Sequence, residues 1–316
     1  MSAHGPDVSI VIPCYRGEKF IRDAIASVLS QEGGRVEVVV VDDGSPDHSA
    51  AVIEAIADSR VRLVRHQRNH GIATARNTGL EASRAGLVAF LDQDDLWLPG
   101  RLGDQLRAFE ADASGDVALV FGITIVIDRL GRTKSSPHRV PHDLPTLRGK
   151  QLLERLIVDN PIPLGAAMIR RRYLDAVGPF DESIRGGSDD FDMIVRLAEH
   201  GRFGFLERQC FARRLHDDNY TRADRMTEES LGVIDRVERR YPDLAHAARV
   251  GRSRKLYRRA RYMQLAGDAK RAVPDYHAAI AAWPWQARAW IALALCHLGP
   301  VGQMFSDWWN RGRNAT

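Results

Sequence analysis

The stretch Leu87-Val-Ala-Phe-Leu-Asp-Gln-Asp-Asp95 sets five apolar residues directly before a cluster of acidic side chains. A short apolar run that ends in polar residues predicts a buried β-strand. Carboxylates crowded at the end of such a strand repel one another unless a cation or hydrogen-bond donors neutralise them. The stretch therefore predicts a strand whose carboxyl end carries a functional site; the simpler alternative is a helix-capping turn.

Segments typical of strands and of helices alternate on both sides of this stretch. The expected strands are residues 8–12, 36–41, 61–65 and 87–91, and the expected helices are residues 18–31, 49–57, 71–85 and 98–111. Such alternation predicts an α/β fold with a mostly parallel sheet flanked by helices. Ligands in these sheets bind at the carboxyl ends of the strands. Further on, residues 203–206 and 210–215 are expected to be two extended segments.

Two other predicted strands also end in polar residues. Pro13-Cys-Tyr15 follows the first strand, and Asp42-Asp43-Gly44-Ser45 follows the second. Carboxylates at this place are able to accept hydrogen bonds from a nucleobase or from ribose hydroxyls, although Asp-Gly also forms ordinary turns. Arg76 falls one to two turns into the next helix, where it either faces a phosphate or points to solvent.

Two motifs in the second half of the chain carry further candidates. Gly186-Gly-Ser-Asp-Asp190 precedes a predicted helix, so its acids are either helix caps or the source of a general base. Arg213-Arg-Leu-His-Asp-Asp-Asn219 follows an extended run and offers His216 as a contact for a metal or a diphosphate. A lone histidine is more often structural.

Charge is distributed unevenly along the 316 residues. The chain has 45 basic and 41 acidic residues, but 17 of the basic and only 9 of the acidic ones lie from Arg222 onward. This asymmetry predicts two regions, residues 1–221 and 222–316. The second region is helical in pattern and matches a tetratricopeptide-type hairpin at Ala260, Gly267, Ala272, Tyr276, Ala279 and Pro284. An ordinary helical tail is the alternative.

Seven basic residues between positions 249 and 261 have no acidic residue among them. Such a run favours peripheral contact with an anionic membrane, or it forms a solvated helix face. Nucleic acid is not an expected partner, because no recognition motif accompanies the charge.

The cysteines and the apolar segments bear on the compartment. Cys14, Cys210 and Cys296 are far apart, so neither a disulfide framework nor a zinc site is expected. The first residues lack the pattern of a signal peptide, and no apolar run is long enough to span a membrane. We expect a cytoplasmic protein, with the inner face of the membrane as a further possibility through the basic run.

Residues 8–220 resemble the family 2 glycosyltransferases, which have the Rossmann-like GT-A nucleotide-sugar-binding fold. The resemblance lies in an ordered set of short motifs: Val8-Ser-Ile-Val-Ile-Pro-Cys-Tyr15, Ser27-Val-Leu-Ser-Gln31, Val41-Asp-Asp-Gly-Ser45, Ala75-Arg-Asn77, Phe90-Leu-Asp-Gln-Asp-Asp-Leu-Trp-Leu-Pro99, Gly178-Pro-Phe-Asp181, Asp189-Asp190 and Arg214-Leu-His216. Where many members have Glu-Asp, this chain has Asp189-Asp190, which leaves the second acid in place.

The resemblance implies a role for each matching residue. Asp190 would be the catalytic base, with Asp189 beside it in the donor site. Asp92 and Asp94 form the DxD motif, which with His216 would hold Mg²⁺ or Mn²⁺ and the sugar diphosphate. The nucleotide would contact Pro13, Tyr15, Glu18, Asp42, Asp43 and Arg76.

The function implied is transfer of a hexose, with inversion, from a nucleoside-diphosphate sugar to an acceptor hydroxyl. The expected products are cell-envelope polysaccharides or glycolipids, and Asp42-Asp43 favours a UDP-sugar. A nucleotidyltransferase is the first alternative, although the loop after residue 12 lacks the repeated glycines of that class. A degenerate, non-catalytic binding protein is the second. The sugar, the acceptor and the oligomeric state are not predicted.

Overall fold

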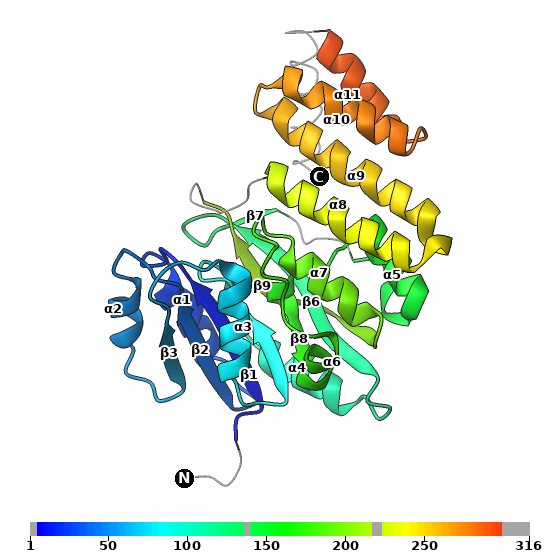
Figure 1. Cartoon of the computed structure of the whole chain (residues 1–316). Coiled ribbons are helices and arrows are strands. Elements are labelled where there is room, and N and C mark those ends of the chain that lie inside the picture. The colour runs from blue at the N-terminus through cyan, green and yellow to red at the C-terminus, as the bar shows by residue number, and fades with distance from the viewer. Residues whose placement is uncertain (1–4, 136–139, 217–222, 299–316) are drawn as a thin grey trace. The chain divides into compact units, whose positions relative to one another are not determined.

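The computed structural model describes residues 5–135, 140–216 and 223–298 (Figure 1). Its chain forms two compact units. Of the described residues, the first unit contains 5–135, 140–153, 161–185 and 189–216, and the second contains 154–160, 186–188 and 223–298.

The first unit alternates strands and helices through its first hundred residues. Its strands are β1 (Val8–Cys14), β2 (Val36–Asp42), β3 (Val61–Arg65), β4 (Leu87–Phe90), β5 (Leu96–Trp97), β6 (Val117–Ile127), β7 (Thr133–Ser135), β8 (Ala167–Arg170) and β9 (Arg202–Arg214). Its α-helices are α1 (Ile21–Leu29), α2 (Ser49–Glu54), α3 (Ile72–Ala82), α4 (Arg101–Glu110), α6 (Arg171–Val177) and α7 (Asp189–Ala198), with 3₁₀ turns at Leu144–Thr146 and Leu164–Ala166. Helix α5 (Gly149–Val158) contributes to both units.

The strands of this unit form one mixed sheet in the order β3-β2-β1-β4-β8-β6-β9-β5, with β7 on β6. The predicted parallel arrangement is confirmed for β1 to β4. Beyond β4 the sheet is mixed, because β8 runs antiparallel to both of its neighbours while β6 and β9 are parallel. The two extended segments expected between residues 203 and 215 are one strand, β9, paired with β6 along its length.

Strands β1 and β2 are buried along their whole length, because helices cover both faces of this part of the sheet (Figure 1). Ile10 and Val38 pack into the main core on one face. Val39 and Val41 pack against Ala75 of α3 on the other face. Strands that are buried on both sides have continuous apolar sequences, which is the pattern of residues 10–13 and 38–41.

The register of the central strands brings three polar segments to one edge of the sheet. Cys14 pairs with Asp42 at the ends of β1 and β2, and Val11 of β1 pairs with Phe90 at the end of β4. Three neighbouring parallel strands therefore end close together. The residues that follow them, Tyr15, Asp43 and Asp92, share this carboxyl edge.

The second unit is helical, with α8 (Ala223–Arg240), a 3₁₀ turn at Pro242–Leu244, α9 (Ala245–Leu265), α10 (Ala269–Ala282) and α11 (Ala287–His297). Gly267 turns the chain between α9 and α10 with a φ of 86°, a conformation that favours glycine. Asp268 caps α10 by accepting a hydrogen bond from the Arg271 N–H. The residues of the predicted hairpin pattern are buried between the helices: Ala260, Ala272, Tyr276 and Ala279. No helix among the described residues is both long and apolar enough to cross a membrane.

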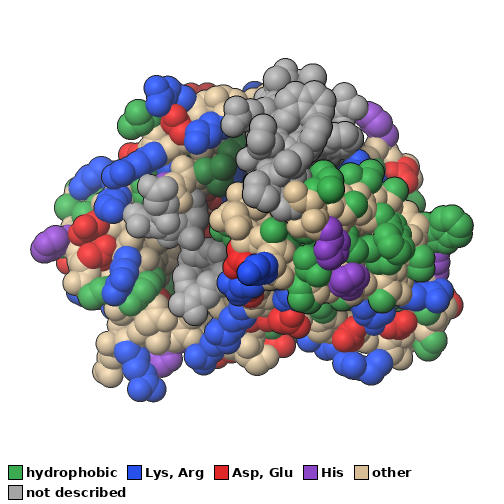
Figure 2. Space-filling view, turned by 90° about the horizontal axis from the view of Figure 1, so that it is seen from above, with side chains coloured by type: hydrophobic (Ala, Val, Ile, Leu, Met, Phe, Trp, Pro, Cys, Tyr) green, Lys and Arg blue, Asp and Glu red, His purple; other side chains and the backbone are tan. Residues whose placement is uncertain are grey.

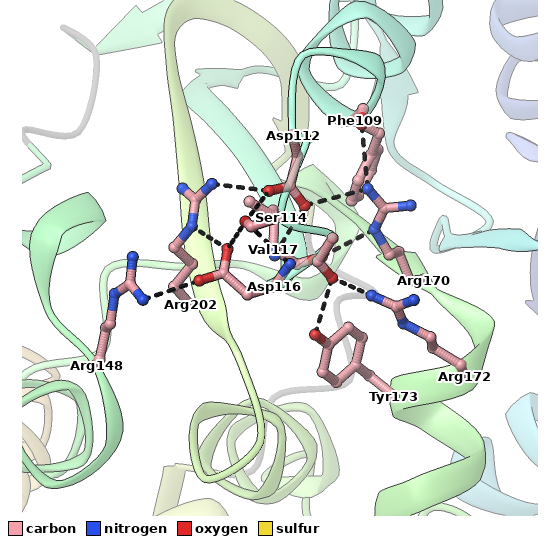
Figure 3. Close-up of polar contacts among 11 residues, drawn as sticks. Phe109, Asp112, Ser114, Asp116, Val117, Arg148, Arg170, Arg172, Tyr173 and Arg202 are labelled. Atoms are coloured by element: carbon pink, nitrogen blue, oxygen red, sulfur yellow. Dashed lines mark hydrogen bonds and ion pairs between the residues drawn. The ribbon is translucent and has the colours of Figure 1, made fainter.

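At the opposite, amino-terminal edge of the sheet, Asp112 joins two strands of the first unit (Figure 3). Its carboxylate is 1 % exposed and accepts hydrogen bonds from Arg170 of β8 (3.2 Å) and Arg202 of β9 (3.0 Å). The Val117 N–H donates to the same carboxylate at 3.0 Å. Burial raises the pKa of Asp112, but the hydrogen bonds from Val117, Ser114 and Arg170 outweigh it and hold the pKa at about 2.

We expect Asp112→Asn to lower the free energy of unfolding by about 2 kcal/mol, because two arginines lose a buried anionic partner. The depressed pKa makes this contribution complete above the ordinary value of 3.8 and removes it as the pH falls toward 2. The difference between wild type and variant should therefore shrink from pH 5 to pH 2, as measured by denaturant unfolding at each pH.

The control for this variant is Asp7→Asn, which removes an ion pair with Arg35 whose side chains are 35 % and 47 % exposed. A change of less than about 1 kcal/mol is expected there, since exposed pairs contribute little. If both variants lose the same free energy of unfolding, the burial of Asp112 does not add to its contribution to stability.

Candidate active site

The loop after β1 is fastened to the acidic loop after β4 by Gln93. The Tyr15 N–H donates to Oε1 of Gln93 at 2.8 Å, and Nε2 of Gln93 donates to the Tyr15 carbonyl at 3.0 Å. A Cβ on Gly17 would meet Oε1 of Gln93, so a larger residue at this position would displace the Gln93 amide from Tyr15. Gln93, to which sequence reasoning gave no role, therefore positions both Tyr15 and the acids on either side of it.

The two acids after β2 hold the local backbone. Asp42 is 2 % exposed and accepts from the Ser45 N–H at 3.2 Å. Asp43 is 3 % exposed and accepts from the N–H groups of His70 (3.0 Å) and Gly71 (2.8 Å). Its Oδ1 also lies 2.7 Å from Nδ1 of His66. Asp43 thus fixes the start of α3, and any hydrogen bond to a nucleotide adds to these contacts or replaces one of them.

Arg76 of α3 joins the acidic loop to the start of α7. Its Nη2 donates to Oδ1 of Asp92 at 2.8 Å, and its Nη1 pairs with Asp189. The Arg76 side chain is 5 % exposed and Asp189 is 1 % exposed, whereas Asp92 remains 44 % exposed. Of these three side chains, Asp92 is the one open to a ligand, and the other two position it.

Asn77, the neighbour of Arg76, connects α3 to the turn before α7. Its Nδ2 donates to the Phe180 carbonyl at 3.0 Å, and its Oδ1 accepts from the Phe180 N–H at 2.8 Å. The Phe180 ring packs edge-on against Phe90 of β4 and lies under the Arg76 guanidinium. These contacts bring Ala75-Arg-Asn77 and Gly178-Pro-Phe-Asp181 together in the fold.

Asp190 is a partly exposed carboxyl group at the start of α7. Burial against the protein and the neighbouring charge of Asp189 raise its pKa to about 6, although the positive charge of Arg76 opposes the shift. A carboxylate whose pKa lies near 6 is an effective general base at neutral pH. The Phe191 N–H donates to Oδ1 at 2.6 Å, which restrains the rotation of the group.

Asp94 and His216 meet across the site. Nε2 of His216 lies 2.9 Å from Oδ2 of Asp94. Burial and the negative charge of Asp92 raise the pKa of Asp94. Asp217, Asp218 and Asn219, which complete this motif in the sequence, lie outside the described residues.

Behind this pair, Asp95 anchors the acidic loop to β9. Its Oδ1 accepts from the Arg214 N–H at 2.8 Å, and Nε of Arg214 donates to the Asp94 carbonyl at 2.9 Å. Burial and the charges of Asp94 and Asp92 raise the pKa of Asp95 well above its ordinary value. These hydrogen bonds to Arg214 hold the backbone of Asp94 and so orient its side chain toward His216.

The donors that are able to hold a divalent cation are the carboxylates of Asp92 and Asp94, with the imidazole of His216. Carboxylate oxygens suit Mg²⁺ and Mn²⁺, and the mutual repulsion of the two acids is what a bound cation relieves. The chemistry of the donors therefore fits such a cation. Among the described residues, no three His, Cys, Asp or Glu side chains are grouped as a metal site.

The remaining predicted contacts lie at the same edge of the sheet. Pro13 is buried within β1, paired with Val41. Tyr15 is 37 % exposed beside it. Glu18 accepts a hydrogen bond from the His48 N–H at 3.0 Å, which links the β1 loop to the loop before α2.

Comparison with known proteins places this arrangement in a family. The model of "Glycosyl transferase family 2" matches residues 9–178. The chain is 36 % identical over 202 residues to the succinoglycan biosynthesis protein ExoO of Rhizobium meliloti. The match covers 62 % of this chain and 57 % of ExoO, so the chain corresponds to little more than half of that relative's length.

Two solved structures have a similar fold. Residues 1–349 of TarS from S. aureus, in complex with UDP-GlcNAc, align with a TM-score of 0.62 and 18 % identity, over 97 % of this chain and 92 % of that one. The mannosyltransferase PcManGT from Pyrobaculum calidifontis, in complex with GDP-Man and Mn²⁺, aligns with a TM-score of 0.59 and 21 % identity, over 96 % and 84 %. The sheet described above is thus the GT-A fold, and the chain belongs to glycosyl transferase family 2.

Proposed function

We propose that this protein transfers a hexose from a UDP-sugar to an acceptor hydroxyl, with inversion at the anomeric carbon. The observation that carries the proposal is the joining of Asp92, Arg76 and Asp189 next to Asp190, whose pKa is raised to about 6. This arrangement sets a proton acceptor beside an acidic loop at the carboxyl edge of the sheet, where ligands of such sheets bind.

The reaction forms one bond and breaks one. The acceptor oxygen bonds to the anomeric carbon while Asp190 takes the hydroxyl proton, and the bond from that carbon to the diphosphate oxygen breaks with its electron pair. Negative charge grows on the departing diphosphate as this bond breaks. Residues 1–221 form the catalytic domain in this proposal, and residues 222–316 a helical accessory region with a tetratricopeptide-like hairpin.

A divalent cation belongs to the proposal. Asp92 and Asp94, with His216, would hold Mg²⁺ or Mn²⁺ together with the diphosphate of the donor. When bound, such a cation supplies positive charge that offsets the charge of the leaving group. Support comes from the donor set described above and from the Mn²⁺ in the structure of PcManGT.

The setting proposed is the synthesis of cell-envelope polysaccharide or glycolipid in the cytoplasm. The name of ExoO supports a polysaccharide product. The free state of Cys14, Cys210 and Cys296 is consistent with a reducing compartment. Family membership argues against the nucleotidyltransferase alternative.

The basic run at residues 249–261 has less free charge than its sequence indicates. Arg252 pairs with Asp235 at 2.6 Å, Arg258 with Asp159 at 2.6 Å, and Arg259 with Asp275 at 2.6 Å. These acids are distant in sequence and belong to the helical unit itself. Peripheral contact with an anionic membrane thus rests on fewer charges, and the vesicle experiment below tests it.

A donor screen by thermal shift tests the proposed activity. With Mn²⁺ or Mg²⁺ present, a UDP-sugar at about 100 times its Kd should raise Tm by roughly 5 °C, because ligand binding at this excess adds about 2.7 kcal/mol. GDP- and dTDP-sugars serve as the comparison. A larger shift with either of them would overturn the UDP assignment, and no shift with any nucleotide sugar would contradict the activity.

A further inference from the structure

The helical unit contains a groove that the proposed transfer reaction does not use. The groove has a volume of about 450 Å³ and lies between α9 and the segment that joins α10 to α11. This volume is in the range of sites that bind small ligands. Its lining includes three arginines, one acid and three aromatic residues: Arg254, Arg258, Arg288, Asp159, Tyr257, Trp283 and Trp285.

The groove has an excess of positive charge. Arg254 and Arg258 share one acid, Asp159, at 3.8 Å and 2.6 Å. Arg288 pairs with no acid within the part of the chain that the structure describes. It belongs to the first turn of α11, which contains no acidic residue, so the positive end of the helix dipole adds to the same field.

An aromatic side chain, Trp285, is exposed at the edge of the groove. Trp285 is 82 % exposed, although hydrophobic side chains of this size are usually covered. Its loop is fixed, because the Trp290 indole N–H donates to the Pro284 carbonyl at 2.9 Å and the Gln286 N–H donates to the Trp283 carbonyl at 3.1 Å. In the view from above, Figure 2 shows a patch of hydrophobic side chains with His among them and with both basic and acidic side chains at its margin.

We propose that this groove binds an anionic saccharide, namely a sugar ring that carries a carboxylate, within the acceptor or product glycan. The apolar C–H face of a pyranose ring packs on an exposed indole such as Trp285. The carboxylate pairs with a guanidinium, which matches its planar shape with two parallel hydrogen bonds. The proposal rests on the proposed function, because an enzyme that builds glycans encounters anionic saccharides as acceptors or products.

Two features favour a saccharide over a membrane surface. The basic and aromatic groups line a concave volume, whereas a bilayer contacts side chains that project from a convex or flat face. The loop that presents Trp285 is fixed before binding, and a fixed loop loses little conformational entropy when a ring packs on it.

The test measures binding of tetragalacturonate to the full chain by isothermal titration calorimetry, with maltotetraose as the neutral probe. We expect binding of tetragalacturonate only, weakened at least tenfold by Arg288→Ala and by Trp285→Ala. The matched controls are Arg249→Ala and Tyr262→Ala, which alter an exposed arginine and a 63 % exposed aromatic residue that do not line the groove. Both should bind like wild type.

Other outcomes overturn the proposal. The proposal fails if tetragalacturonate does not bind, if maltotetraose binds with the same affinity, or if the control variants lose as much affinity as the groove variants. A membrane is the alternative partner, and it is tested by co-sedimentation with vesicles of 30 % phosphatidylglycerol and 70 % phosphatidylcholine. If wild type binds these vesicles, the groove variants do not, and no saccharide binds, the surface is a membrane contact. Nucleotide-sugar affinity, measured on the same samples, reports the first unit: if it is intact while tetragalacturonate fails to bind, the inference fails and the proposed function stands.

Discussion

Asp190→Asn is expected to lower turnover about 100-fold or more, while the affinity for the nucleotide sugar stays within a factor of about three. The amide has nearly the shape of the carboxylate but cannot accept the proton of the acceptor hydroxyl. Donor binding depends on other groups at the carboxyl edge of the sheet. Steady-state rates and calorimetric donor affinity, measured on the same preparation, separate the two effects.

The pH dependence of the wild-type enzyme follows from the same group. Because burial and the charge of Asp189 raise the pKa of Asp190 to about 6, its carboxylate becomes protonated as the pH falls below that value and can then no longer act as the proposed base. Activity should fall about tenfold per pH unit well below pH 6 and level off above pH 7. The raised pKa also means that the ionised group destabilises the fold above its ordinary value of 3.8, so Asp190→Asn should not lower Tm at pH 7.

The control for this prediction is Asp175→Asn, since Asp175 is an exposed acid of α6 that lines a hollow with Asp7 and Gly86, at the starts of β1 and β4. Its turnover and its pH profile should match those of wild type. Full activity of the Asp190→Asn enzyme would exclude Asp190 as the base, and an acid limb near pH 4 would show that its carboxyl group is not perturbed.

The place where the candidate site residues gather was predictable, because it depends on where the strands end. Apolar runs ending at Cys14, Asp42 and Phe90 fix where β1, β2 and β4 stop, and parallel pairing then aligns these ends. The local sequence indicates both where each strand ends and that strands alternate with helices, which predicts parallel pairing. The loop that contains Asp92 lies near Arg76 and Asp189 because of that topology, and the structure shows direct contacts among these three residues.

The internal partners of the site residues were not predictable, because each is distant in sequence. Gln93 bonds to the backbone of Tyr15, 78 residues away, and Asp95 bonds to the backbone of Arg214, 119 residues away. Nothing in the local pattern marks these residues as different from other polar loop residues. The same reason explains the basic run, where Arg259 has its acidic partner, Asp275, on the next helix.

The length of β6, in the part of the sheet beyond β4, was also not predictable from local sequence. Residues Val117–Ile127 form one long strand, because β9 pairs with it through several shifts of register. This strand is buried along most of its length, so its sequence shows no apolar–polar alternation, and the register shifts in its pairing leave no mark in the local pattern.

Asp94→Ala is expected to abolish the metal-dependent part of donor binding. In wild type, removal of the divalent cation with EDTA should weaken the affinity for the nucleotide sugar about 100-fold, or about 3 kcal/mol. The variant should bind as weakly as wild type in EDTA, and EDTA should not change its affinity. The reason is that Asp92 alone cannot offer the two carboxylates that suit Mg²⁺ or Mn²⁺. Isothermal titration with and without EDTA measures each affinity.

Folding and metal binding are distinguishable in this experiment. Asp94 lies near two other acids, and burial together with the charge of Asp92 raises its pKa, so removal of its charge should not lower Tm. Asp175→Ala is the matched control and should keep the full response to EDTA, because that side chain is exposed and lies on α6. If wild type binds the nucleotide sugar equally well with and without EDTA, the acidic loop does not act through a cation. Asp92 and Asp94 would then contact the donor without one, and the repulsion between them would have to be relieved by Arg76 and His216 alone.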